Sequence, residues 1–448
     1  MTIHFSGIAG AGMNPLARLL AAWGERVQGS DRSFDAGQNR EIRAALEAAG
    51  IRLWPQDGRA ITAELRQVVY SSAVEAETAE LRAARALGIP CQPRPELLAA
   101  LLNRAQPGVA VSGTSGKSSV VGMLAWILRC LGVPASVLGG AALAGEGTAG
   151  LLVVGPRAGP LIAEACESDG SLVGYHPAIG VVHNISRDHG ELDDLQRQFA
   201  QFAAQCRTLL VNADCPLAGA ACAGRPQLTY GAAAGANLLL EPISAGPQRA
   251  RGVLSIDGRD LTLDLPVPGE HTLSNAAAAL AVVHALALDV AAAAAALASW
   301  PGVARRFEIV ALSEGGVRVI DDYAHNPAKI AAAVRAAQLA SDRVLCLFQP
   351  HGYGPAKLLR PDLARLLPEL LRPQDAWLYL PIYYAGGTVT RDISSADLAR
   401  DSGVDAVADR REALGWVCAR VQPGDTVLIM GARDPTLPEF ARALAAAL

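Results

Sequence analysis

Short apolar runs alternate with helical patterns in the first segment of the chain, residues 1–103. The run from Ile3 to Phe5 predicts a strand, a glycine turn follows, and a helical pattern extends from Met13 to Trp23. The stretches RVQGSD, VVYSSA and IPCQ predict further strands between helices. Alternating strands and helices are typical of an α/β fold with a parallel sheet. We expect a Rossmann-like domain here.

The second segment, residues 104–299, has a more varied pattern. The apolar runs PLIAEA and IGVVHNIS predict buried parallel strands. LTYG and GVLSIDGRDLTLDLPVPG predict an antiparallel meander with an Asp-Gly turn. An alanine-rich helical stretch over 275–298 closes the segment. We expect a central domain with a mostly parallel sheet.

The third segment, residues 300–448, begins after Trp300-Pro301-Gly302. Its strands VRVIDDYAHNP, RVLCLFQPHG, DAWLYLPIYYAGG and DTVLIMGARD each end in polar or glycine residues. Ligands of open α/β sheets bind beyond such carboxyl ends. The pattern predicts a second Rossmann-like domain, and thus a three-domain α/β protein.

Composition excludes several classes of protein. Apolar residues make up 51% and charged residues 18%, which is globular, and the net charge of −4 argues against nucleic-acid binding. None of the eight cysteines has C-x-x-C spacing, so no zinc or redox motif is indicated. The start lacks a secretory pattern, and the alanine run at 291–298 is too short to span a bilayer. We expect a cytoplasmic protein without membrane or nucleic-acid partners.

The stretch Gly113-Thr114-Ser115-Gly116-Lys117-Ser118 lies between a predicted strand and a predicted helix. Backbone N–H groups of such a loop can bind phosphates at a helix N-terminus. The lysine would reach the outer phosphates and Ser118 would hold magnesium. The alternative is a glycine turn before an ordinary helix. The strand before the loop and the helix after it favour a triphosphate site.

Other strand ends carry weaker signals. In GIAGAGM the glycines at 7, 10 and 12 do not match the dinucleotide pattern G-x-G-x-x-G, so a diphosphate site is an alternative. EACESDGS places Glu164, Glu167 and Asp169 after an apolar strand, where carboxylates could face a magnesium–triphosphate group or simply form an acidic loop. NISRDHGE, ARRFE and DDYAHNP are polar segments that, taken singly, are more often structural.

Together these motifs resemble the Mur ligase superfamily, whose members form amide bonds with ATP in peptidoglycan precursor synthesis. The resemblance extends over nearly the whole chain. Its motifs are GTSGKS (113–118), ESDGS (167–171), NISRDH (184–189), GEHTLSN (269–275), RRF (305–307) and DDYAHNP (321–327). Within the superfamily, the chain is most similar to the branch that joins L-alanine to UDP-N-acetylmuramate and to its relative that attaches a recycled tripeptide. That similarity rests on GIAGAGM, GSD (29–31), SSA (71–73), FQPH (348–351) and MGARD (430–434).

The resemblance implies a role for each segment. Residues 1–103 would bind the UDP-sugar donor, 104–299 would bind ATP, and 300–448 would bind the amino-acid acceptor. ATP would convert a carboxylate to an acyl phosphate, which an amine then attacks. The cofactors would be ATP and Mg²⁺, the other partners would be small-molecule substrates, and the protein would be a monomer or homodimer.

The resemblance also assigns residues to sites. The catalytic group would be Lys117, Glu167, His189 and His351, and the metal ligands Ser118, Glu167 and His189. ATP would contact Gly113, Thr114, Ser115, Gly116, Lys117, Ser118, Ser119, Asn275, Arg306, Asp322 and Asn326. The donor would contact Gly10, Ala11, Gly12, Met13, Asp31, Ser71 and Ser72. The acceptor would contact Tyr323, His325, His351 and Arg433.

The chain departs from the family pattern most strongly in its acceptor segment, FQPHGYGPAK. Gly352 and Pro355 replace two arginines that would bind the carboxylate of an amino acid. The expected function is therefore an ATP-dependent ligase that joins an amino acid to a UDP-N-acetylmuramate-like carboxylate. The alternative is a related ligase with a non-alanine amine or peptide as acceptor. Two further hypotheses are a dinucleotide-dependent oxidoreductase and a non-catalytic nucleotide-binding protein.

Overall fold

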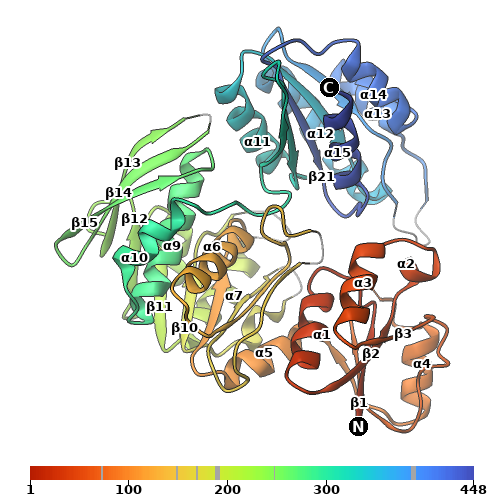
Figure 1. The fold of residues 1–448 in the computed structure, drawn as a ribbon, viewed down its shortest axis with the longest axis vertical. Helices are drawn as coiled ribbons and strands as arrows, with labels where there is room; N and C mark the ends of the chain where they lie inside the picture. Colours follow the sequence, from red (N-terminus) through yellow and green to blue (C-terminus); the bar gives the residue numbers. More distant parts are fainter. Residues whose placement is uncertain (72–73, 148–149, 168–169, 187–191, 247, 385–389) are drawn as a thin grey trace. The chain divides into compact units, whose positions relative to one another are not determined.

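The computed structural model describes residues 1–448 except 72–73, 148–149, 168–169, 187–191, 247 and 385–389 (Figure 1). The described residues form three β-sheets. The chain divides into two compact units, which are unit 1 (Met1–Ser244 and Ala250–Gly302) and unit 2 (Ala245–Arg249 and Val303–Leu448).

Unit 1 begins with a parallel sheet of strand order β3-β2-β1-β4-β5. The central strand buries Ile3 and Phe5 completely, and α1 follows it directly, so the glycine turn lies at the carboxyl end of the sheet. The strands are β1 (Thr2–Ser6), β2 (Arg26–Ser30), β3 (Arg52–Trp54), β4 (Leu65–Tyr70) and β5 (Cys91–Pro93). The helices are α1 (Met13–Ala22), α2 (Arg32–Asp35), α3 (Arg40–Ala48), α4 (Ala79–Ala86) and α5 (Arg94–Arg104).

The second sheet of unit 1 has the order β15-β14-β13-β12-β11-β10-β6-β9-β7-β8. From β13 to β7 the paired strands whose register is described are parallel. Antiparallel pairs stand at both edges, β14 with β15 and β7 with β8. The strands are β6 (Gly108–Ser112), β7 (Ser136–Gly139), β8 (Leu151–Val153), β9 (Leu161–Glu164), β10 (Ile179–Val182), β11 (Thr208–Asn212), β12 (Leu228–Gly231), β13 (Leu238–Ala245), β14 (Ala250–Ile256) and β15 (Arg259–Leu265).

Two groups of helices pack against this central sheet. One group consists of α6 (Lys117–Cys130), α9 (Glu270–Ala285) and α10 (Val290–Leu297), which contact one another. The other consists of α5, the short 3₁₀ helix η1 (Ser171–Gly174), α7 (Leu192–Gln205) and α8 (Pro216–Ala221). Helical cover explains why strands such as β6 and β10 are buried throughout, because a parallel sheet is covered on both faces. It also places the start of α6 beside α9.

Unit 2 contains a sheet of order β16-β17-β21-β18-β19-β20, in which only the edge pair β16–β17 is antiparallel among the described strands. Alternate side chains of its strands enter two different cores. Ile320, Cys346 and Phe348 pack with α11–α13, whereas Leu345 and Leu347 pack with α14 and α15. The elements are β16 (Glu308–Leu312), β17 (Arg318–Asp322), α11 (Pro327–Ala340), β18 (Val344–Gln349), α12 (Tyr353–Leu370), β19 (Ala376–Tyr379), α13 (Ser395–Ser402), β20 (Asp405–Ala406), α14 (Arg410–Cys418), β21 (Thr426–Gly431) and α15 (Leu437–Ala447).

The expected α/β class with mostly parallel sheets is confirmed. One local expectation was wrong. LTYG forms β12, which pairs in parallel with β11 and β13, so only β14 and β15 form the expected hairpin around Asp257-Gly258. The alanine-rich stretch is helical, as expected, and is divided into two helices, because Ala287 adopts φ 54° and Asp289 caps α10 through the N–H groups of Ala291 and Ala292. The segment boundaries at 103 and 299 stay predictions.

Candidate active site

The glycine loop lies between β6 and α6, as expected. Gly113 and Gly116 have φ of 142° and 84°, and a Cβ at Gly116 would lie 2.5 Å from Oδ1 of Asn275. A side chain is therefore excluded at Gly116 by both backbone conformation and space. The loop ends where α6 begins at Lys117, so its free N–H groups belong to a helix N-terminus.

The segment after β10 holds this loop in place. Asn184 accepts a hydrogen bond from Ser115 N at 2.8 Å and donates one to Ser115 O at 3.0 Å. Thr114 Oγ1 accepts from Ser186 N at 3.0 Å. Because β6 and β10 are neighbouring parallel strands, their carboxyl ends meet at one edge of the sheet. The motif that begins at Asn184 thus supports the phosphate loop directly, a role that no single-segment pattern revealed.

Two carboxylates face the start of α6. Lys117 Nζ lies 2.8 Å from Glu167 Oε2 and also donates to the carbonyl of Gly113. Ser118 donates to Glu164 Oε2 at 3.1 Å, and Glu164 Oε1 accepts from Gly140 N at 2.8 Å. Burial lowers the pKa of Lys117, but the Glu167 and Glu164 carboxylates outweigh it and raise that pKa above its usual value. Lys117 is therefore a fixed ammonium group at the loop.

A buried histidine that the motifs did not single out lies behind the loop. His183 is 3% exposed, its Nδ1 is 2.8 Å from the Tyr230 hydroxyl, and a Cβ at Gly116 would meet its ring. Burial lowers the pKa of His183 to about 4, which a hydrogen bond with Asn275 only partly opposes. His183 is therefore neutral near pH 7 and packs against the loop beside Asn275 of α9.

The expected metal set is only partly described. His189, with Asp188, and Ser168 and Asp169 of the acidic motif lie outside the described residues. Within the described ranges, no cluster of three or more His, Cys, Asp or Glu side chains suits a metal ion. Ser118, Glu164 and Glu167 nevertheless place hydroxyl and carboxylate oxygens around the first turn of α6, and these hard donors are the type that Mg²⁺ prefers.

The expected donor residues lie at the carboxyl edge of the first sheet. The N–H groups of Gly7 and Ile8 both donate to Ser30 O, which folds the turn back on β2. The Asp31 carboxylate accepts from Ala9 N at 2.9 Å and from Ser33 N at 2.9 Å. Gly10, Ala11, Gly12 and Met13 follow in this turn and the start of α1, and Ser71 N donates to Ser6 O beside it. Ser72 lies outside the described residues.

Unit 2 brings three of the four expected acceptor residues together at the carboxyl ends of β17 and β18. The rings of Tyr323 and His325 lie 5.6 Å apart, and those of His325 and His351 lie 5.5 Å apart. The Arg306 guanidinium stands 4.8 Å from the centre of the Tyr323 ring. Arg433 follows β21 with φ 66° and is exposed, and no contact with this ring cluster is described for it.

Two residues expected to bind ATP have local structural roles in unit 2. Asp322 accepts hydrogen bonds from Phe307 N and Ala324 N, each at 2.7 Å. Asn326 caps α11 by accepting from Lys329 N at 2.9 Å. These contacts shape the backbone around the ring cluster.

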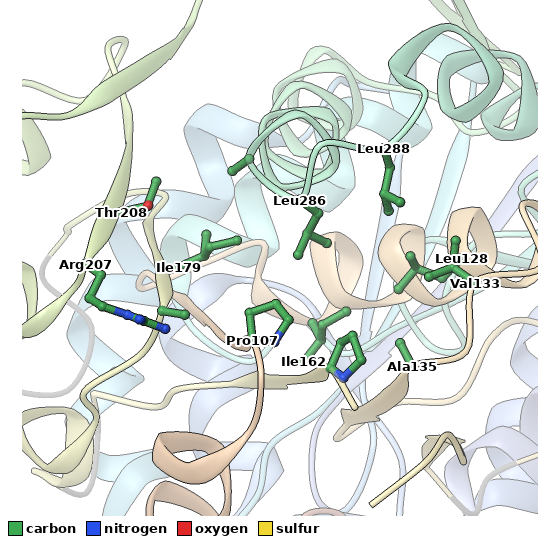
Figure 2. A pocket seen from close by; sticks show the side chains of 13 residues that line it. Pro107, Leu128, Val133, Ala135, Ile162, Ile179, Arg207, Thr208, Leu286 and Leu288 are labelled. Carbon is green, nitrogen blue, oxygen red and sulfur yellow. The ribbon is translucent and has the colours of Figure 1, made fainter. Parts of the chain in front are cut away.

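A cavity of about 440 Å³ lies at the amino ends of the central strands, opposite to the ends that carry the glycine loop (Figure 2). It is lined by residues such as Pro107, Ile179 and Thr208, which precede or begin their strands, whereas the glycine loop follows the end of β6. The other labelled side chains are mostly aliphatic, including Leu128, Ile162 and Leu286. The cavity therefore belongs to a different part of unit 1 from the loop chemistry.

Three family models match the chain in sequence order. They are the Mur ligase family catalytic domain over residues 2–116, the Mur ligase middle domain over 111–283, and the Mur ligase glutamate ligase domain over 305–433. Together with the relatives below, they show that the chain belongs to the Mur ligase family of ATP-dependent carbon–nitrogen ligases. No helix in the described residues is both long and apolar enough to cross a membrane.

Full-length relatives narrow the similarity to one kind of Mur ligase. UDP-N-acetylmuramate–L-alanine ligase of Synechococcus sp. (strain JA-2-3B'a(2-13)) is 37% identical, with 97% of this chain and 90% of the relative covered. The enzyme of the same name from Streptomyces avermitilis is 35% identical, with 97% and 95% covered. The crystal structure of UDP-N-acetylmuramate–alanine ligase from Thermotoga maritima gives a TM-score of 0.80 at 26% identity, covering 100% of this chain and 99% of that one.

Proposed function

We propose that this protein joins L-alanine to the carboxylate of UDP-N-acetylmuramate, with ATP converted to ADP and phosphate. The proposal rests on the Lys117–Glu167 pair at a glycine loop that is hydrogen-bonded to the segment after β10. It is supported by relatives that carry this name and match nearly the whole chain. These relatives favour L-alanine over another amine or a peptide as acceptor.

The chemistry needs two displacements. A donor carboxylate oxygen attacks the γ-phosphorus of ATP, the bond to the β-phosphate oxygen breaks, and ADP leaves. The amine nitrogen then attacks the acyl carbon, loses a proton, and expels inorganic phosphate. Phosphorylation is required because a free carboxylate would have to expel oxide. The protein contributes position and charge stabilisation in both steps.

We assign the first displacement to unit 1. The loop N–H groups of residues 113–118 would hold the β- and γ-phosphates, and the raised pKa of Lys117 keeps its ammonium charged beside them. Ser118, Glu164 and Glu167 would hold Mg²⁺, with His189 as a further ligand. When bound, Mg²⁺ neutralises charge on the phosphate oxygens. Asn275, beside the loop, and Ser119 complete the nucleotide contacts from this unit.

The remaining roles form part of the same proposal. The turn at residues 10–13, with Asp31, Ser71 and Ser72, would bind the UDP diphosphate. Tyr323, His325, His351 and Arg433 would surround the acceptor, and Arg306, Asp322 and Asn326 would contact ATP. We place the enzyme in the cytoplasm as a monomer or homodimer.

A single assay tests the proposed function. Purified protein is incubated with ATP, Mg²⁺, UDP-N-acetylmuramate and L-alanine, ADP release is followed, and the product is identified by mass spectrometry. We expect ADP formation only when all four are present, and a product in which alanine is joined through an amide. ADP formation that does not depend on the amine, or a product formed only with another amine, would contradict the proposal.

A further inference from the structure

In its acceptor segment, this chain has Gly352 and Pro355 at the two positions where the family pattern has arginines, so two cationic side chains are missing there. Gly352 precedes α12 with φ 70°, and a Cβ on Gly354 would meet no atom within 4 Å. The start of α12 therefore borders open space. If the proposed function holds, an α-amino acid brings a carboxylate to this region, and a carboxylate taken from water needs charged or hydrogen-bonding partners.

The guanidinium group of Arg391 lies near the start of α12. Arg391 lies 4.7 Å from the centre of the Tyr384 ring and 6.0 Å from that of Tyr353, the first residue of α12. The two rings are themselves 5.3 Å apart and inclined by 60°. Rings of this kind hold a guanidinium through cation–π attraction and leave its N–H edge available. Within the described parts of the chain, the Arg391 side chain has no hydrogen-bond or carboxylate partner.

A second polar group in the same cluster is unsatisfied. The hydroxyl of Tyr384 is buried and has no hydrogen-bond partner among the described residues. A buried hydroxyl without a partner is unfavourable, so a ligand oxygen that accepts its hydrogen bond would be favoured. A carboxylate offers two oxygens, one for this hydroxyl and one for a guanidinium N–H group.

The backbone connects this cluster to His351. His351 and Tyr383 form a parallel β-bridge, and Gly352 N donates to Tyr383 O at 2.8 Å. Tyr353 and Tyr384 are the next residues along the two paired segments after Gly352 and Tyr383. These backbone contacts place the Arg391 guanidinium at the same carboxyl edge of the sheet as the rings of His325 and His351.

The other cations of this region are less suited. Lys357 is paired with Asp392, and Arg305 bonds to Asp321 and to the carbonyl of Gly431. Arg433 is exposed, as Arg391 also is, but within the described residues no aromatic ring or carboxylate fixes the Arg433 side chain. Since a flexible side chain loses more entropy on binding, the held guanidinium is the better carboxylate partner.

From these contacts we infer that Arg391 and the Tyr384 hydroxyl bind the carboxylate of the amino-acid acceptor. Arg391 thereby supplies, from the segment before α13, the charge that Gly352 and Pro355 do not. The inference rests on the proposed function for the identity of the acceptor. According to this inference, Arg391 and Tyr384 make the enzyme prefer α-amino acids to amines that lack a carboxylate.

The test compares L-alanine with L-alaninamide, which keeps the amine and lacks the carboxylate. The measured quantity is the ratio of kcat/KM for the two acceptors, with ADP release as the readout. Arg391→Gln should lower kcat/KM for L-alanine about 10- to 100-fold, mainly through KM, and leave that for L-alaninamide unchanged. Tyr384→Phe should act in the same direction with a smaller effect, and Arg391→Lys should restore only part of the ratio.

Two further arginines serve as comparisons. Arg335→Gln changes an exposed arginine of α11 and should leave the ratio at the parent value. Arg433→Gln tests the other candidate. A ratio that stays at the parent value in Arg391→Gln, or that collapses in Arg433→Gln instead, would overturn the inference.

A binding measurement separates this inference from the proposed function. Saturation-transfer NMR on the methyl signal of L-alanine, with UDP-N-acetylmuramate and a non-hydrolysable ATP analogue present, requires no turnover. Transfer in the parent that is lost in Arg391→Gln supports the carboxylate site even if no ADP forms, in which case the proposed function alone fails. Equal transfer in both proteins, or none in the parent, would refute the site.

Discussion

At the scale of single residues, Lys117 is the side chain on which phosphate chemistry depends most. Its ammonium group is charged, enclosed and fixed by Glu167 and the Gly113 carbonyl. Lys117→Ala should lower the rate of ADP formation about 10²–10³-fold, because a positioned charge at a developing negative charge is lost. Arg197→Ala, which removes an exposed cation from α7, should leave the rate unchanged. Turnover close to the parent rate in folded Lys117→Ala would refute the phosphate-loop assignment.

His183 makes the loop region sensitive to acid. Its pKa of about 4 in the folded protein lies below the unfolded value of about 6.5, so folding favours the neutral ring. Above pH 6.5 the ring is neutral in both the folded and the unfolded state. As the pH falls from 6.5 through 4, the unfolded state binds a proton that the folded state does not, so the free energy of unfolding falls by an amount on the order of 3 kcal/mol. We expect thermal-unfolding midpoints to fall more steeply over this range for the parent than for His183→Gln. Parallel pH profiles of the two proteins would contradict this assignment.

At the scale of elements, α6 offers a matched pair of glycines, one at each end. Gly116 has φ 84° and a crowded Cβ position, whereas Gly132 has φ 66° and no atom within 4 Å of its Cβ position. Alanine at Gly132 should destabilise the protein by about 1–2 kcal/mol, because its backbone is left-handed. Alanine at Gly116 should destabilise it more, because its Cβ would also clash with Asn275 and His183. Only Gly116→Ala should also abolish binding of a non-hydrolysable ATP analogue, measured by calorimetry. Equal affinities in the two variants would show that the loop does not contact the nucleotide.

The carboxylate of Glu80 is another contact between elements, because it joins α4 to two strands of the first sheet. It is fully buried, lies 3.0 Å from His4 Nε2, and accepts hydrogen bonds from Ser6 and Ser30. Ser6 and Ser30 end β1 and β2, directly before the glycine turn and Asp31. α4 is thereby tied to the two strand ends that shape the donor turn.

At the scale of the whole molecule, two compact units predict unfolding in more than one step. Glu80→Ala should lower only the transition of unit 1, and Asp425→Ala, which removes the partner of Arg343, should lower only that of unit 2. Removing one member of a buried pair costs about 3–5 kcal/mol at most. Scanning calorimetry of the two variants assigns the transitions. One cooperative transition that both variants lower equally would contradict independent units.

The sequence predicted the elements well where local pattern and tertiary role agree. Buried parallel strands such as β10 and β18 are almost entirely apolar, and the loop at 113–118 has its glycines where backbone conformation requires them. LTYG was misplaced because a short apolar strand carries no signal for its direction. The helix break at Ala287 was missed because alanine rarely adopts a left-handed conformation, so composition gave no warning.

By itself, the sequence determined the α/β class, the phosphate loop and the family resemblance, because each depends on residues close together in the chain. Tertiary structure alone decided that His183 and Asn275 enclose Gly116, that Glu80 contacts two strand ends, and that Arg391 lies beside the rings of Tyr353 and Tyr384. Each of these groupings includes a contact between residues 30 or more positions apart, and the bonded residues Ser115 and Asn184 are separated by 69 positions. The physical reason is that parallel strands bring their carboxyl ends to one edge, so distant loops meet there whatever their separation in the chain.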